Sequence, residues 1–196
     1  MITKDQKTQR IQDAALELFS RYGFRRTAML DIAEAAGISR AALYLYFKNK
    51  DEVFRSLSSR LHDETMVAVD GVLQGDGPAL ERIEQAMMTF MRDLTAPVMA
   101  SPHGQELFDA NMTLAADITQ AAQARLQTGV EDVLSQAENG EEIDLGRLQS
   151  TVPELAQMIV HAGFGLKHAA LPVAPDLATQ FALFMRIIAR ALLPDR

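Results

Sequence analysis

The sequence predicts an all-α fold on three observations. Apolar residues recur every three or four positions along most of the 196 residues, as they do on one face of a helix. Glycine and proline residues separate these stretches. No segment alternates apolar and polar residues as a half-buried strand does. The composition agrees, because 48% hydrophobic residues exclude a disordered chain, and the absence of cysteine excludes a disulfide scaffold and a cysteine-based metal or redox site.

The first third of the chain divides into short helical stretches. Gly23 and Gly37 follow two of them and are suited to helix C-termini. Ser39 is a good N-cap for the third, whose inward residues would be Leu43 and Phe47. The expected helices cover residues 11–22, 29–36, 39–47 and about 50–72.

Turn signals divide the remaining residues in the same way. The clearest break is Gly75-Asp76-Gly77-Pro78, and the acidic stretch 138–142 indicates an exposed loop. The expected helical stretches run from about 78 to 94, from about 103 to 111 and on through a long helix to 137, from 153 to 168 and from 175 to 193.

Charge is unevenly distributed along the chain. The net charge of −7 argues against a nucleic-acid partner, yet residues 1–60 hold 11 Lys and Arg against 7 Asp and Glu, a net charge of +4. The other 136 residues hold 8 basic and 19 acidic groups, a net charge of −11. A basic head on an acidic body is expected where only the head meets phosphates, although a chance imbalance would look similar.

The first residues, 1–10, are mostly polar and do not resemble a signal peptide. No run of eighteen apolar residues indicates a transmembrane span. We therefore expect a cytoplasmic protein.

The most informative feature is the tight turn Gly37-Ile38-Ser39 between two short helices. Glycine permits a positive φ angle there, and a short helix that begins after such a turn fits the DNA major groove. An ordinary helical hairpin is the alternative. However, the run Leu43-Tyr44-Leu45-Tyr46-Phe47 cannot face one side of a helix, so some of these residues must lie outside, where tyrosine hydroxyls suit phosphates.

These residues resemble a known family. The stretch 32–39 (Ile-Ala-Glu-Ala-Ala-Gly-Ile-Ser), followed by 43–47 and by Lys48-Asn49-Lys50-Asp51, is similar to the DNA-binding domain of TetR-family transcriptional regulators. The upstream residues Ala14, Ala15, Leu18, Phe19, Tyr22, Gly23, Phe24 and Thr27 agree, so the resemblance covers about residues 8–55. It implies a three-helix helix-turn-helix DNA-binding domain over 1–49 and a helical ligand-binding and dimerisation domain over 50–196.

The resemblance also implies residue roles. Residues 40–42 would face base edges, Tyr44 and Tyr46 would touch phosphates or thymine methyls, and Lys50 would bind a phosphate. Thr27 and Ala28 would hold a phosphate at the start of the second helix. The full DNA-binding set is Thr27, Ala28, Ser39, Arg40, Ala41, Ala42, Tyr44, Leu45, Tyr46 and Lys50.

Three residues depart from the family pattern. Ala28 and Ala42 stand where a hydroxyl is common, and Leu45 replaces a residue that is commonly polar or aromatic. We therefore expect few hydrogen bonds to bases, with Arg40 as the main candidate for reading guanine.

The family pattern further implies a repressor that binds a pseudo-palindromic operator as a homodimer and is released by a small, apolar effector. The dimer would form through about 153–168 and 175–193, where Ala162, Gly163 and Gly165 allow close helix approach. The alternative is that these two helices only complete the core. Activation instead of repression also remains open.

A methionine-rich apolar set indicates where an effector could bind, although such a stripe is more often plain core. The set comprises Met87, Phe90, Met91, Met99, Phe108 and Met112. His103, Glu106 and Asn111 could add polar contacts, although a surface or capping role is more common for such residues. His103, Glu106 and Asp109 could also share one helical face, which is weak evidence for a metal site.

We expect no metal, no cofactor and no catalytic residue, because no set of nucleophile, base and orienting group is present. Two alternatives remain open. One is a helical binding protein whose head no longer reads DNA. The other is a small helical enzyme whose chemistry is assembled from distant residues.

Overall fold

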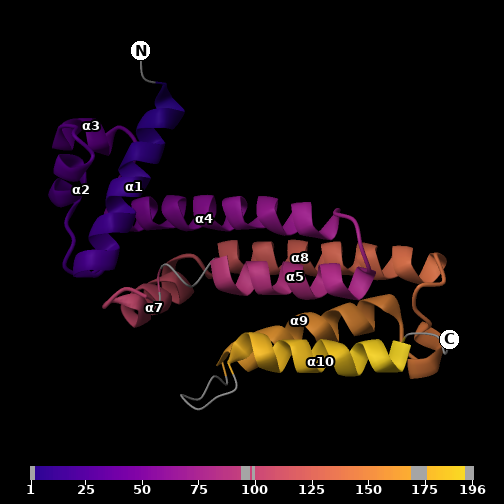
Figure 1. The fold of residues 1–196 in the computed structure, drawn as a ribbon. Helices are drawn as coiled ribbons and strands as arrows, with labels where there is room; N and C mark the ends of the chain where they lie inside the picture. The colour runs from indigo at the N-terminus through magenta and orange to yellow at the C-terminus, as the bar shows by residue number, and fades with distance from the viewer. Residues whose placement is uncertain (1–2, 94–97, 99, 169–175, 193–196) are drawn as a thin grey trace. The chain divides into compact units, whose positions relative to one another are not determined.

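The computed structural model describes residues 3–93, 98, 100–168 and 176–192. Every regular element within these ranges is helical, which confirms the all-α prediction. No helix in the described part of the chain is long and apolar enough to cross a membrane. The elements, labelled in Figure 1, are α1 (Lys4–Tyr22), α2 (Met29–Ala35), α3 (Arg40–Tyr44), α4 (Lys50–Leu73), α5 (Ala79–Asp93), α7 (Gly104–Leu114), α8 (Ala116–Asn139), the 3-10 helix η1 (Leu145–Leu148), α9 (Val152–His168) and α10 (Leu177–Leu192).

The chain forms two compact units. Unit 1 holds Met1–Glu64 and Leu94–Ala121, and unit 2 holds Thr65–Asp93 and Ala122–Arg196. Helices α4 and α8 therefore contribute residues to both. The start of α4 belongs to unit 1 because Val53, Phe54 and Leu57 are buried with the residues of α1, α2 and α3. The domain boundary expected between residues 49 and 50 stays a prediction.

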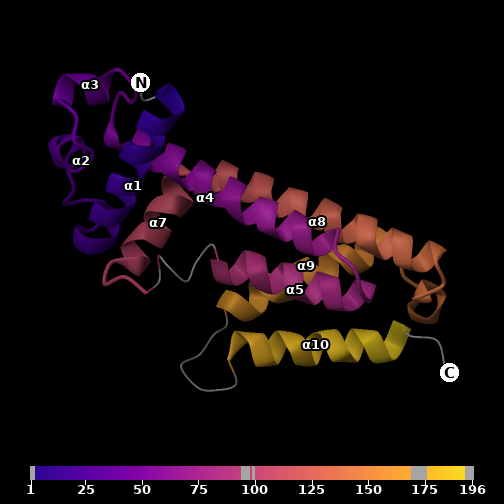
Figure 2. The ribbon, with the colours of Figure 1, turned by 45° about the horizontal axis from the view of Figure 1, so that its top comes forward.

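The core of unit 1 is built around α1. Ile11, Ala15 and Phe19 lie on one stripe of this helix and are almost fully buried. The rings of Phe19, Phe24 and Phe54 pack against one another at centroid distances between 5.2 and 5.7 Å. Helix α7 packs against α1 in the same unit, as Figure 2 shows. The three-helix head is thus supported by α4 and α7.

The core of unit 2 brings α5, α9 and α10 together, and the three helices lie side by side in both views (Figures 1 and 2). Phe90 of α5 meets Phe164 of α9 edge-on, with ring centroids 5.7 Å apart. Gly163 lets these helices approach closely, because a Cβ at this position would lie 2.5 Å from Cε of Met87 and 3.3 Å from a ring carbon of Phe181.

Two helix ends differ from the sequence prediction. The third helix was expected to run through Phe47, but α3 ends at Tyr44. The next N–H groups, of Leu45 and Tyr46, bond to carbonyls three residues back, a tighter turn that ends the α-helix. Between α7 and α8 the helical path breaks at Ala115, although neither glycine nor proline stands there.

Candidate nucleic-acid interface

The turn between α2 and α3 has the geometry that its glycine predicts. Gly37 adopts φ +66°, in the left-handed region that favours glycine. The guanidinium of Arg10 donates to the carbonyl of Ala36 at 3.0 Å and would lie 3.1 Å from a Cβ on Gly37. Ser39 then caps α3, because its Oγ accepts the N–H of Ala42 at 3.1 Å, as predicted. Arg10, which the sequence interpretation did not single out, therefore helps to hold the turn.

The outer face of α3 comprises Arg40, Ala41, Tyr44 and the following Leu45, all exposed. Leu43 and Phe47 are buried beneath them, as the sequence predicted. Leu45 is 84% exposed and Tyr44 43% exposed, so both offer surface to a partner.

The other residues expected to contact DNA differ in exposure. Ser39 is exposed and Ala42 is half-buried on α3. Tyr46 is half-buried and packs against the core of unit 1. Lys50 is also half-buried, at the start of α4.

The N-terminus of α2 is already engaged in the chain itself. Thr27 is only 3% exposed, and its hydroxyl donates to the carbonyl of Gly23 at 2.8 Å. The N–H of Ala28 donates to a carboxylate oxygen of Asp31 at 2.7 Å. A phosphate at this end of α2 would therefore bind the remaining backbone N–H groups, and the nearby carboxylate of Asp31 would repel it.

Lys50 is bound to the segment between α1 and α2. Its Nζ donates to the carbonyls of Phe24 at 2.6 Å, Arg25 at 3.2 Å and Thr27 at 2.8 Å. The ammonium also lies 4.4 Å from the centre of the Phe24 ring. Burial lowers the pKa of this lysine, against the raising effect of nearby carboxylates. Because an ammonium has three hydrogens, a phosphate contact would require at least one of these bonds to be exchanged.

Glu106 of α7 binds the same segment. One of its carboxylate oxygens accepts the N–H of Arg25 at 2.7 Å, and the other lies 3.5 Å from Nδ1 of His103. Gly23 has φ +86°, and a Cβ there would lie 2.5 Å from the carboxylate of Glu106. The sequence favours a surface or capping role for Glu106, with a pocket or a metal site as alternatives, whereas in the structure its carboxylate supports the segment that leads into the helix-turn-helix.

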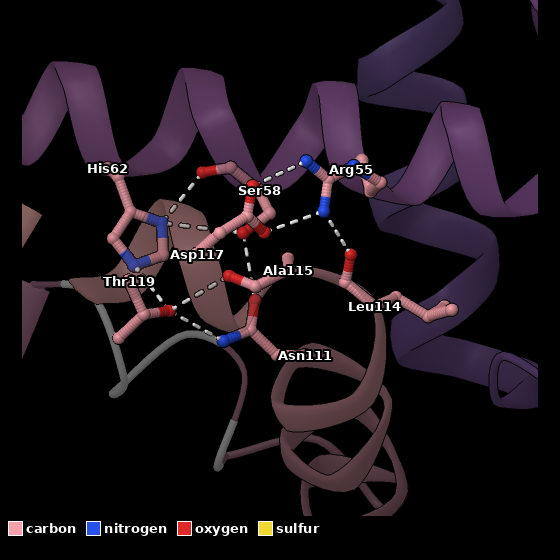
Figure 3. Close-up of polar contacts among 8 residues, drawn as sticks. All are labelled: Arg55, Ser58, His62, Asn111, Leu114, Ala115, Asp117 and Thr119. Carbon is pink, nitrogen blue, oxygen red and sulfur yellow. Dashed lines mark hydrogen bonds and ion pairs between the residues drawn. The ribbon is translucent and has the colours of Figure 1, made fainter. Parts of the chain in front are cut away.

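Polar contacts also join α4 to the junction of α7 and α8 within unit 1 (Figure 3). Arg55 forms two hydrogen bonds of 2.7 Å with the two carboxylate oxygens of Asp117, and it also donates to the carbonyl of Leu114. The hydrogen bonds from Arg55 lower the pKa of Asp117 to about 2.

Beside this ion pair, four side chains form a chain of hydrogen bonds (Figure 3). Ser58 Oγ donates to Asn111 Oδ1 at 2.8 Å, and Asn111 Nδ2 donates to Thr119 Oγ1 at 2.9 Å. Thr119 Oγ1 lies 3.2 Å from Nε2 of His62, whose Nδ1 lies 2.8 Å from the carbonyl of Ser58. A carbonyl can only accept, so Nδ1 of His62 carries a hydrogen; in the neutral ring Thr119 therefore donates to Nε2. In this order the single hydroxyl hydrogen of Thr119 goes to Nε2 of His62, at 3.2 Å, and not to the carbonyl of Ala115, which lies 3.4 Å away.

The residues expected to line an effector pocket are divided between the two units. Met87, Phe90 and Met91 are fully buried in the core of unit 2. His103, Phe108 and Met112 lie in unit 1, where Met112 is exposed, and Met99 falls outside the described residues. Among the described residues, no three His, Cys, Asp or Glu side chains gather as metal ligands would. The pocket stays a prediction.

An apolar groove runs along α9 and α10. Its lining residues recur at helical spacing and are Ala162, Gly165 and Leu166 of α9 and Gln180, Leu183, Phe184 and Ile187 of α10. Leu183 and Ile187 are more than half exposed, and a Cβ on Gly165 would meet nothing within 4 Å. The part of the predicted dimer surface at residues 175 and 193 lies outside the described residues.

A short helix that follows a glycine turn and packs on two other helices has the geometry of a helix-turn-helix domain of the DNA-binding type. Comparison with known proteins identifies it further. Residues 11–57 match the family model of bacterial regulatory proteins of the tetR family. The helix-turn-helix segment of this chain is therefore similar to the DNA-binding domain of that family.

Two curated relatives illustrate the match. The chain is 39% identical over 67 residues to the uncharacterized HTH-type transcriptional regulator YfiR of Bacillus subtilis (strain 168), and the matched segment covers 34% of this chain and 33% of YfiR. It is 45% identical over 49 residues to the HTH-type transcriptional regulator AcrR of Shigella flexneri, and the matched segment covers 25% of this chain and 23% of AcrR. The matched segments thus span a third or less of these relatives.

Solved structures extend the likeness to the fold of nearly the whole chain. SmeT, the repressor of the Stenotrophomonas maltophilia multidrug efflux pump SmeDEF, aligns with a TM-score of 0.70 at 22% identity over 96% of this chain and 91% of SmeT. Its complex with triclosan aligns with a TM-score of 0.68 at the same identity, over 96% and 92%. At this identity the likeness concerns the fold alone.

Proposed function

We propose that the protein is a sequence-specific DNA-binding transcriptional regulator that acts in the cytoplasm, where its DNA is. The observation that carries this proposal is the outer face of α3, where Arg40, Ala41, Tyr44 and Leu45 are exposed above a buried Leu43. A helix presented in this way fits the major groove, where base edges carry a distinct pattern of donors and acceptors. The YfiR and AcrR matches, both to regulators, support the same assignment.

The regulator acts as a homodimer on a pseudo-palindromic operator. One helix-turn-helix buries little area on DNA, and two-fold dimers usually supply specific affinity. The groove of α9 and α10 supports a second copy of the chain as its occupant, because its exposed Leu183 and Ile187 and the open space at Gly165 suit helix-on-helix packing. It also lies within the two helices that the family resemblance assigns to the dimer.

The proposed mechanism is repression relieved by a small molecule. SmeT is a repressor and has been solved with triclosan, which supports the same logic in this chain. The buried Met66, Met87, Met91 and Met185 give unit 2 side chains that adapt to irregular shapes. An effector needs only to bind more tightly to the conformation whose two heads are wrongly spaced for the operator.

The test is selection of bound duplexes from a random DNA pool with the purified full-length protein at physiological salt. Enrichment of an inverted repeat, together with a dimeric mass by light scattering, is the expected result. If the protein is folded and dimeric but enriches no sequence, the DNA-binding proposal fails and a ligand-only role takes its place.

A further inference from the structure

Arg40 and Tyr44 lie one helical turn apart on the outer face of α3. The guanidinium carbon of Arg40 lies 5.6 Å from the centre of the Tyr44 ring, within the range of a cation–π contact. Both side chains are exposed, so the contact forms on the surface that the proposed function gives to DNA.

The N–H groups of Arg40 are available to a partner. Within the described residues, its guanidinium makes no hydrogen bond and no ion pair, and its contact is with the ring of Tyr44. A guanidinium carries five N–H donors in one plane, and those of Arg40 have no hydrogen-bond partner among the described residues. Arg10, Arg55 and Arg60, by contrast, already bind a carbonyl or a carboxylate of the chain.

The rest of the helix offers little else for reading bases. Residues 40–45 are Arg-Ala-Ala-Leu-Tyr-Leu, so hydrogen bonds from their side chains to base edges can come only from Arg40 or Tyr44. Guanine presents two acceptors, O6 and N7, to the major groove, and a guanidinium binds both at once.

We propose that Tyr44 is a positioning residue that holds Arg40 in the orientation that reads a guanine in each half-site. This inference rests on the proposed function and names the residue pair behind its specificity. The ring limits the conformations of Arg40 before DNA binds, so less freedom is lost when the two bonds to guanine form. With another base those bonds are not made, so the ring stabilises only the guanine complex, and its loss lowers discrimination.

The test compares duplexes that carry the selected site with duplexes in which one guanine pair per half-site is replaced by adenine, at fixed salt. The wild-type protein should prefer the guanine duplex by about 5- to 150-fold at the position read by Arg40. Arg40→Ala should bring this ratio close to one. Tyr44→Leu should lower it about two- to fivefold, the factor that corresponds to an exposed cation–π contact. Tyr44→Phe, which keeps the ring, should leave the ratio unchanged.

The outcomes separate the inference from the proposed function. If Tyr44→Leu and Tyr44→Phe both weaken binding to every duplex equally, with the ratio intact, Tyr44 acts through its hydroxyl on the DNA backbone and the inference is overturned. An unchanged ratio in Arg40→Ala at every guanine would overturn it too. If the wild-type protein binds all duplexes alike, the proposed function itself fails. Far-UV circular dichroism confirms that each variant is folded.

Discussion

Lys50 and Glu106 bind the two sides of one residue in the segment between α1 and α2. The carboxylate of Glu106 accepts the N–H of Arg25 at 2.7 Å. The ammonium of Lys50 donates to the carbonyl of Arg25 at 3.2 Å and to the carbonyls of Phe24 and Thr27. This segment leads directly into α2. Side chains from α4 and α7 therefore fix where the helix-turn-helix begins.

Removal of the Lys50 ammonium should destabilise unit 1. Lys50→Met keeps the apolar stem but leaves three carbonyls without their donor, which should cost about 1–3 kcal/mol in the free energy of unfolding. Chemical denaturation measures this loss. Lys48→Met is the matched control, because that exposed side chain has no bond to the described residues and its loss should leave stability unchanged.

The same variant tests the expected phosphate contact. If Lys50 exchanges a carbonyl for a phosphate on the operator, the slope of log affinity against log salt should become shallower by about 0.9 in Lys50→Met. An unchanged slope would restrict Lys50 to its role within the chain.

Acid should weaken unit 1 through Asp117. The pKa of this carboxyl is about 2 in the folded chain, below its ordinary value of 3.8, because Arg55 binds the ionised form. The stabilisation is therefore present above about pH 4 and is lost as the pH falls towards 2. Thermal melts should show a smaller drop between pH 4 and pH 2 for Asp117→Asn than for the wild type. Asp76→Asn, in the exposed turn before α5, should retain the full drop.

The hydrogen-bond chain at His62 should depend on the hydroxyl of Thr119. Thr119→Val keeps the shape but removes the donor to Nε2 of His62 and the acceptor for Asn111, at a cost of about 1–3 kcal/mol. Thr119→Ser keeps the hydroxyl and should lose much less. Nitrogen NMR of the wild type should show the hydrogen of the neutral ring on Nδ1, and a hydrogen on Nε2 would contradict the assigned bond directions.

A charge placed in the α9 and α10 groove should separate the dimer. Ile187 is 59% exposed in the chain, so Ile187→Glu should leave the subunit folded but bury a carboxylate at the proposed interface. The dimer dissociation constant should rise by about 100-fold or more, as measured by light scattering or sedimentation. Val67→Glu, at a 70% exposed apolar position on α4, is the control. Dimers of equal strength in both variants would place the interface elsewhere.

The sequence predicts most of the helices because their signals are local. Apolar spacing marks α1, and Ser39 and Gly37 mark the start of α3 and the turn before it, as the structure confirms. The early end of α3 at Tyr44 and the break at Ala115 occur at residues with no helix-breaking tendency, so no signal in the composition precedes them.

The supports of the helix-turn-helix were harder to predict. Glu106 lies 81 positions from Arg25, so only the tertiary fold brings them together. Its spacing from His103 suggested a metal or pocket group, and Lys50 was given only a phosphate role. Polar contacts of this kind follow from packing and leave no periodic pattern in the sequence.

The central claim is that the outer face of α3 is the surface that binds DNA, and Ala41 tests it most directly. Ala41 is exposed at the middle of this face, so Ala41→Glu should keep the fold and the dimer while bringing a negative charge against DNA. Titration of the duplex selected with the wild type should show an affinity lower by about 100-fold or more. Gln85→Glu, an exposed position on α5, should bind as the wild type does. Equal affinity of Ala41→Glu and the wild type would contradict the account.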